Sequence, residues 1–128
     1  MIAVDTSILV RYFVQDDVRQ AALATELLEA ILTAERPGLI TVVTLHETAW
    51  VLQRVYKLDW NRVKAILAAL LDVPNLVIER PQQVARALAA DTGFGDALIH
   101  FVANDMGATK TVTFDRKFAR FPGVELLV

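Results

Sequence analysis

The chain has 128 residues, of which 55% are hydrophobic, with a formal net charge of −2 at pH 7 and no cysteine. This length predicts a single domain over residues 1–128, and the lack of cysteine excludes disulfides and thiolate metal sites. The negative charge argues against a simple basic nucleic-acid-binding module. Because no apolar run approaches the ~20 residues of a membrane span and no basic region precedes the first one, we expect a cytoplasmic protein without membrane association.

The N-terminal segment predicts one strand and two helices. Met1–Val4 has the pattern of a buried strand, and Thr6 or Ser7 is expected to cap a short helix. The apolar residues of this helix are Leu9, Val10, Tyr12 and Phe13. Asp16-Asp17 opens a longer helix, whose predicted inner face consists of Ala24, Leu27, Leu28 and Ile31.

The middle of the chain predicts a second strand and two more helices. Pro37-Gly38 ends the preceding helix, and the β-branched run Leu39–Val43 predicts a strand. A helix from Thr44 to about Tyr56 follows, with an inward stripe of Leu45, Ala49, Leu52, Val55 and Tyr56. Asp59 caps a further helix, whose stripe consists of Val63, Ile66, Leu67, Leu70 and Leu71.

The C-terminal part predicts three strands and two helices. Leu76–Ile78 is a short strand, and Pro81 suits the first position of a helix through Val84, Ala85 and Leu88. A second helix opens at Asp96 and ends before Gly107, which suits a C′ position. The last strands are Thr111–Phe114 and Val124–Val128, separated by Pro122-Gly123. Strands alternating with helices predict a mostly parallel central sheet in a three-layer α/β/α fold.

Four acidic residues stand beside apolar segments: Asp5, Glu47, Asp96 and Asp115. In an open α/β sheet, sites form outside the carboxyl ends of the strands, so we expect these carboxylates to converge. A cluster of oxygen ligands suits Mg²⁺ or Mn²⁺ rather than zinc or copper. The pattern therefore predicts metal-assisted phosphodiester chemistry.

Each acid also has a local explanation. Asp5 could cap the helix after it, and Glu47 could form a capping box with Thr44. Asp96 could stabilise a helix N-terminus through the macrodipole, and Asp115 could start a turn. Four acids in the same kind of position are harder to explain by caps alone.

Several short motifs occur in order along the chain: Val4-Asp5-Thr6-Ser7, Leu45-His46-Glu47, Gly95-Asp96-Ala97-Leu98-Ile99, Thr113-Phe114-Asp115, and the ending from Phe118 through Phe121-Pro122-Gly123-Val124. With these motifs the whole chain resembles the PIN domain, and within it the VapC-type toxins of toxin–antitoxin pairs. The resemblance implies a PIN-like fold, ribonuclease activity, a homodimer and a cognate antitoxin.

The resemblance also implies an acidic metal site formed by Asp5, Glu47, Asp96 and Asp115. Thr6 and Thr113 match hydroxyl positions near that site. Many relatives carry a further acid where this chain has Gly93, and Asp91 is the neighbouring acid that could replace it. Whether one metal or two would bind therefore stays open.

The sequence favours a Mg²⁺- or Mn²⁺-dependent endoribonuclease. Asp5, Asp96 and Asp115 are expected to hold the metal, and Glu47 to complete its shell or orient the attacking water. The alternatives are a non-catalytic interaction domain with the same fold and an aspartate-based phosphotransferase, although a haloacid-dehalogenase-like enzyme would need an Asp at Ser7. A nucleotide-binding module is disfavoured because no Gly-rich phosphate motif follows a strand. The RNA substrate is not identified.

Other residues carry weaker signals. His100 shares a helix face with Asp96, and we expect it to line the rim of the site rather than bind metal. Trp50 and Trp60 are expected to pack rather than stack on bases. For Arg11, which follows Asp5, and for Arg116, Lys117 and Arg120, which follow Asp115, a local basic patch and an ordinary solvated face are equally good interpretations.

Two partner chains are expected. The apolar surplus suggests that part of the surface is covered, in line with a homodimer. An antitoxin segment would insert apolar anchors into a groove between helices and pair an Arg with Asp5 or Asp96. The expected groove residues are Leu9, Tyr12 and Phe13.

Overall fold

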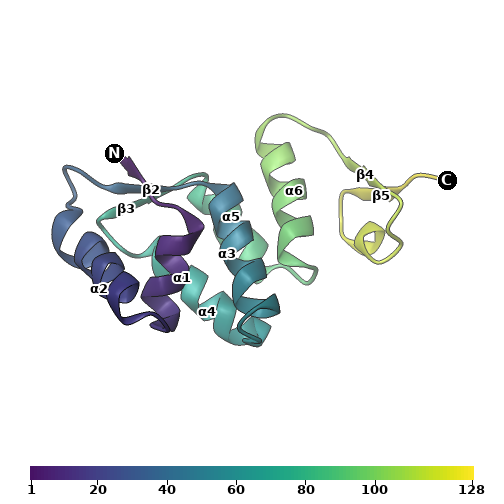
Figure 1. The fold of residues 1–128 in the computed structure, drawn as a ribbon. Coiled ribbons are helices and arrows are strands. Elements are labelled where there is room, and N and C mark those ends of the chain that lie inside the picture. The colour runs from purple at the N-terminus through teal and green to yellow at the C-terminus, as the bar shows by residue number, and fades with distance from the viewer. The chain divides into compact units, whose positions relative to one another are not determined.

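The computed structural model describes residues 1–128. The chain divides into two compact units, Met1–Glu79 and Arg80–Val128. Each unit contains its own small parallel sheet and its own helices (Figure 1). The expectation of one domain over residues 1–128 stays a prediction.

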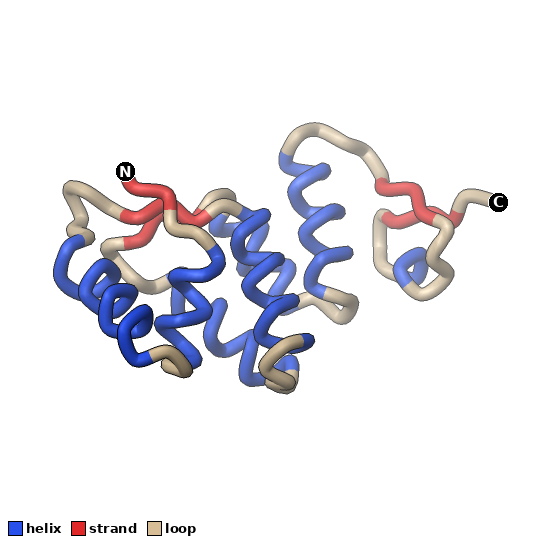
Figure 2. The backbone as a smooth tube through the Cα atoms, viewed as in Figure 1, coloured by secondary structure: helices blue, strands red, loops and turns tan.

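Three short parallel strands form the sheet of the first unit, in the order β1-β2-β3. They span Ile2–Ala3 (β1), Gly38–Ile40 (β2) and Leu76–Ile78 (β3). In Figure 2 these strands (red) run along the top of the unit, and its helices (blue) extend below them. β1 is an edge strand in which Ile2 is 46% exposed. The predicted N-terminal strand is confirmed at Ile2–Ala3, but its predicted burial is wrong, since of Met1–Val4 only Val4 is buried.

Four α-helices complete this unit: α1 (Thr6–Val14), α2 (Val18–Glu26), α3 (Val42–Arg54) and α4 (Trp60–Leu71). α1 packs against α2 and α3, and α3 packs against α4. The core lies where their apolar stripes meet, and its fully buried side chains include Leu9, Leu32, Ile40, Leu45, Leu52, Val63 and Leu67. Asp59 caps α4 as predicted, because its side chain accepts a hydrogen bond from Arg62 N.

A π-helical turn, η1 (Leu27–Ile31), follows α2 and shifts its apolar face. A π turn holds one residue more than an α turn, so the positions after it rotate relative to the preceding face. Leu28 is buried as predicted, but Ile31 is exposed and Leu32 takes the inward position. The 3.6-residue period of the sequence pattern could not anticipate this shift.

α3 begins two residues earlier and ends two residues earlier than predicted. Thr41 is its N-cap and accepts a hydrogen bond from Thr44 N, so Val42 and Val43 belong to the helix rather than to the strand. Leu45, Ala49 and Leu52 form the predicted inward stripe. Val55 lies past the end of the helix and is exposed, so its predicted place in the core is wrong.

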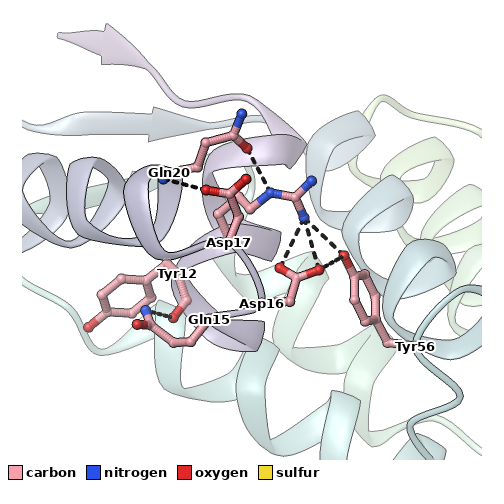
Figure 3. Close-up of polar contacts among 7 residues, drawn as sticks. Tyr12, Gln15, Asp16, Asp17, Gln20 and Tyr56 are labelled. Atoms are coloured by element: carbon pink, nitrogen blue, oxygen red, sulfur yellow. Dashed lines mark hydrogen bonds and ion pairs between the residues drawn. The ribbon is translucent and has the colours of Figure 1, made fainter.

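A polar cluster ties α1 to the start of α2 and to the end of α3 (Figure 3). The Arg11 guanidinium donates to Gln20 Oε1, to Asp16 and to the Tyr56 hydroxyl, at 2.7, 3.2 and 2.9 Å. Tyr56 in turn donates to Asp16 Oδ2 at 2.7 Å. The hydrogen bond from Tyr56 and the charge of Arg11 lower the pKa of Asp16. These hydrogen bonds connect Arg11 of α1 with the start of α2 and with Tyr56, which follows α3.

The second unit contains two helices and a two-stranded parallel sheet. Its elements are α5 (Pro81–Ala89), α6 (Phe94–Asp105), β4 (Thr111–Thr113), the short 3₁₀ turn η2 (Phe118–Arg120) and β5 (Val124–Leu126). α5 packs against α6, and their buried residues include Val84, Leu88, Ala97 and Leu98, whereas Ala85 is exposed. Pro81 at the first helical position and Gly107 just after α6 are confirmed.

All strand pairs in the chain are parallel, as predicted. A parallel pair requires a crossover, and helices provide the connections between the strands of the first unit. Six α-helices with parallel strands are consistent with a three-layer α/β/α fold.

Candidate metal site

Asp5 stands at the junction between β1 and α1. It is the N-cap residue of α1, so the predicted capping role of Thr6 or Ser7 is wrong. Its carboxylate makes no cap hydrogen bond and accepts only from Ser7 Oγ, at 3.1 Å. The side chain is exposed. Because no backbone group uses this carboxylate, it is available to an ion or a substrate.

Thr6, the next residue, has the one buried side-chain polar atom that lacks a hydrogen-bond partner, its Oγ1. A buried hydroxyl without a partner costs about 1–3 kcal/mol, so such an atom needs a specific explanation, and an ordered water or a bound ion is one. This observation supports the expectation that Thr6 belongs to the site.

Glu47 lies on the exposed face of α3. The predicted capping box with Thr44 is absent because Thr41 is the cap residue. The Val42 N–H is instead satisfied by the Glu79 carboxylate, at 2.9 Å, from the end of β3. No hydrogen bond or ion pair involves the Glu47 side chain, which leaves its carboxylate without a structural role.

Asp96 lies in the first turn of α6 and is half-buried. A carboxylate at this position is favoured by the helix dipole. Its side chain makes no cap hydrogen bond, and the N-cap residue Gly93 has no side chain to offer one. Helix stabilisation therefore accounts for the charge of Asp96, but it leaves the carboxylate oxygens free.

Asp115 follows β4 and organises a turn. Its Oδ1 accepts hydrogen bonds from Lys117 N at 2.8 Å and Phe118 N at 3.1 Å. Thr113 Oγ1 accepts from Asp115 N at 3.0 Å. The local explanation is thus confirmed for one oxygen of Asp115, and the other oxygen has no hydrogen-bond partner. The Thr113 hydroxyl therefore serves as a hydrogen-bond acceptor within this turn.

His100 is a core residue rather than a rim residue. Its side chain is 4% exposed, its Nδ1 is 2.8 Å from Thr111 Oγ1, and its Nε2 is 3.2 Å from Asn104 Nδ2. It also packs edge-on against the Phe121 ring. Both ring nitrogens are occupied by structural partners, so the prediction that His100 lines the site is wrong.

The prediction for Trp50 is also wrong, because its side chain is 51% exposed. The Arg54 guanidinium lies 5.9 Å from its ring centroid. Trp50 lies outside the inward stripe of its helix, and the residue type alone does not separate packing from exposure because Trp is common in both situations. Trp60 is half-buried at the first residue of α4.

The four predicted acids are divided equally between the two units. Asp5 and Glu47 belong to Met1–Glu79, whereas Asp96 and Asp115 belong to Arg80–Val128. The structure contains no group of three or more His, Asp or Glu side chains arranged to hold a metal ion. The chemical type of the candidate ligand atoms nevertheless suits Mg²⁺ or Mn²⁺. They are hard carboxylate oxygens with few structural hydrogen bonds, and the Thr6 hydroxyl beside Asp5 has no hydrogen bond.

Comparison with known proteins identifies the family. The PIN domain family profile matches residues 2–124. No curated protein matches the chain. None of its helices combines the length and the apolar character that crossing a membrane requires. The PIN domain match covers nearly the whole chain and includes all four acids and the hydroxyl residues Thr6 and Thr113. The chain therefore belongs to the PIN domain family, whose fold is generally that of a nuclease.

Proposed function

We propose that this protein is a Mg²⁺- or Mn²⁺-dependent endoribonuclease of the VapC type. The family match supports nuclease chemistry. The observation that carries the proposal further is the state of the four acids. The carboxylates of Asp5, Glu47 and Asp96 make no hydrogen bond that shapes the backbone, and Asp115 uses only one oxygen in its turn.

In this proposal Asp5, Asp96 and Asp115 would hold the ion, and Glu47 would complete its shell or orient the attacking water. When bound, a divalent ion polarises the scissile phosphate and lowers the pKa of a bound water. Glu47 accepts a proton from the water that it orients. The Thr6 hydroxyl has a free donor to offer to the same region.

The test is cleavage of single-stranded RNA by near-isosteric variants. Asp5→Asn and Asp96→Asn should abolish cleavage and leave the circular dichroism spectrum unchanged. Asp72→Asn is the matched control, because it removes the same charge from an exposed residue after α4. Wild-type activity in Asp96→Asn would show that the site is assigned wrongly. A protein that binds Mn²⁺ through Asp5 but never cleaves RNA would instead be a non-catalytic domain with this fold.

We further propose a cytoplasmic toxin that is restrained by an antitoxin. The antitoxin segment would place an Arg against Asp5 or Asp96 and apolar side chains along α1. Leu9 cannot line such a groove, because it is fully buried in the core. Tyr12 and Phe13 are half-buried, with ring centroids 5.2 Å apart, and they remain the candidates for apolar contact.

Competition between the antitoxin and Mn²⁺ tests this arrangement, since both need the same carboxylate oxygens. Inhibition should require more antitoxin at the higher of two Mn²⁺ concentrations. Equal potency at both concentrations, with full metal uptake in the complex, would contradict pairing of the Arg with the acids.

A homodimer is part of the proposal. Large apolar side chains are exposed in both units, among them Val43, Val55, Ile99 and Met106. Such residues favour association when they gather on one surface. Sedimentation velocity should give a dimer at micromolar concentration, and a clean monomer would count against it.

A further inference from the structure

The cations of the second unit fall into two groups. Arg80 forms an ion pair with Asp105, Lys110 pairs with Glu125 at 2.9 Å, and the Arg86 guanidinium lies 4.4 Å from the Phe101 ring centroid. The remaining three are exposed and form no ion pair or cation–π contact: Arg116, Lys117 and Arg120. The unpartnered positive charge of this unit is therefore concentrated in five residues next to Asp115.

An exposed aromatic ring stands at the start of the same segment. Phe114 is 80% exposed, although Phe118, four residues later, is buried. A Phe that contributes to a core loses most of its exposure, so packing within the unit does not account for Phe114. We call residues Phe114–Arg120 the basic turn.

The basic turn is held in shape by its own hydrogen bonds. The Asp115 carboxylate accepts from two backbone N–H groups, and Ala119 N donates to Asp115 O at 3.0 Å. The buried side chain of Phe118 anchors the turn. Lys117 and Arg120 are three residues apart across the 3₁₀ turn η2, a spacing that places side chains on the same side. A turn ordered before binding loses less entropy when its cations meet a partner.

We propose that the basic turn binds single-stranded RNA, with Arg116, Lys117 and Arg120 contacting phosphates and Phe114 stacking on a base. Three unpaired cations match a polyanion, and an exposed ring beside them matches the flat face of a nucleobase. An acidic peptide would satisfy the charges but would give the ring no partner. The inference rests on the proposed ribonuclease function, and it places substrate recognition in the turn that contains Asp115.

Fluorescence anisotropy with a labelled single-stranded RNA of mixed sequence tests the inference. The parent is full-length Asp96→Asn protein in Mg²⁺, in which the RNA stays intact. Each cation replaced by Gln should reduce the slope of log affinity against log salt by about 0.7, and the triple variant by about 2. Lys110→Gln is the matched control, because Glu125 already pairs with that cation.

Phe114→Ala should weaken RNA binding by about 5- to 100-fold with an unchanged salt slope, because stacking on a base does not release counterions. Phe114→Trp should retain the affinity of the parent. Unchanged circular dichroism in each variant establishes that the unit is folded.

The outcomes separate this inference from the proposed function. If wild-type protein cleaves RNA but the turn variants bind it like the parent, the inference alone is wrong. If wild-type protein neither binds nor cleaves RNA, the proposed function fails and the inference fails with it. If Phe114→Ala abolishes self-association and leaves RNA affinity intact, the basic turn is an interface between copies and the inference is overturned.

Discussion

At the scale of single residues, the useful question is which polar atoms have a structural partner. Asp59 and Asp17 accept hydrogen bonds from helix N-termini, whereas Asp5 stands at an N-cap without capping. Sequence alone cannot distinguish these cases, since all three residues precede a helix. Hydrogen-bond geometry separates an acid that serves the fold from one that is free for chemistry.

Replacing Thr6 by Val should leave the metal-free protein as stable as the wild type, or more stable. The hydroxyl is buried without a partner, so removing it removes a desolvation cost. Thr48→Val is the matched control: its Oγ1 donates to Thr44 O at 2.7 Å, and its loss should cost about 1 kcal/mol. Melting temperatures in EDTA measure both changes. Equal destabilisation in the two variants would mean that Thr6 already has a partner.

Gly93→Asp should raise the affinity for Mn²⁺ several-fold. Gly93 has ordinary backbone angles, φ −57° and ψ 142°, and a Cβ there would meet only Asp96 Oδ2, at 3.8 Å. The new carboxylate therefore fits without strain and lies beside a proposed ligand. Gly93→Ala should raise stability by reducing the entropy of the unfolded chain, without changing the affinity. Isothermal titration that gives the same affinity for both variants would exclude a ligand role for this position.

At the scale of elements, helix caps decide where the predicted boundaries hold. Strand β3 is predicted with the bounds that the structure shows, and helix α4 is predicted with the cap that the structure shows, Asp59. α3 is predicted with the wrong start: its cap, Thr41, is local, but its first N–H group, that of Val42, is satisfied by Glu79, which is 37 residues away in sequence. A partner so distant leaves no local pattern.

Thr41→Ala should lower the free energy of unfolding by about 1 kcal/mol, because it removes the N-cap of α3. Glu47→Gln should leave that free energy unchanged and abolish RNA cleavage. Urea unfolding of the two variants measures the first quantity, and an RNA assay the second. A large loss of stability in Glu47→Gln would favour a capping box after all.

Asp16→Asn should remove the stabilisation that the Asp16 carboxylate gives to the fold at neutral pH. The pKa of Asp16 is lowered in the folded chain, so its stabilising effect is present above its ordinary pKa of about 4 and is lost as the pH falls further. The difference in melting temperature between wild type and Asp16→Asn should thus be constant at neutral pH and should disappear as the pH falls below about 4. Asp72→Asn, which removes the same charge from another exposed residue, is the control.

At the scale of the whole molecule, much of the fold and less of the site follow from sequence. Alternating strands and helices predict parallel pairing, because a helix between two strands provides the long crossover that a parallel pair requires. Every strand pair in the structure is parallel. The acids are identified as candidates by their positions after apolar runs. The roles of His100 and Trp50 were predicted wrongly, because burial of a single side chain depends on partners such as Thr111 and Asn104 that no periodicity encodes.

Mn²⁺ should raise the melting temperature of the whole chain if the four acids serve one ion. A ligand at about 100 times its Kd adds about 2.7 kcal/mol to the stability of the folded state, which corresponds to roughly 10 °C for a chain of this size. Asp5→Asn from the first unit and Asp96→Asn from the second should each remove this shift. Differential scanning calorimetry would contradict a shared ion if either variant retained it.

The half-exposed indole of Trp50 also has a practical consequence. The chain contains only two tryptophans, so its ultraviolet emission reports on very few positions. Iodide should quench the Trp50 contribution strongly, and any macromolecule that covers this face of α3 should shield it and shift the emission to the blue. The protein thus contains an intrinsic optical probe, and docking on α3 can be followed without attaching a dye.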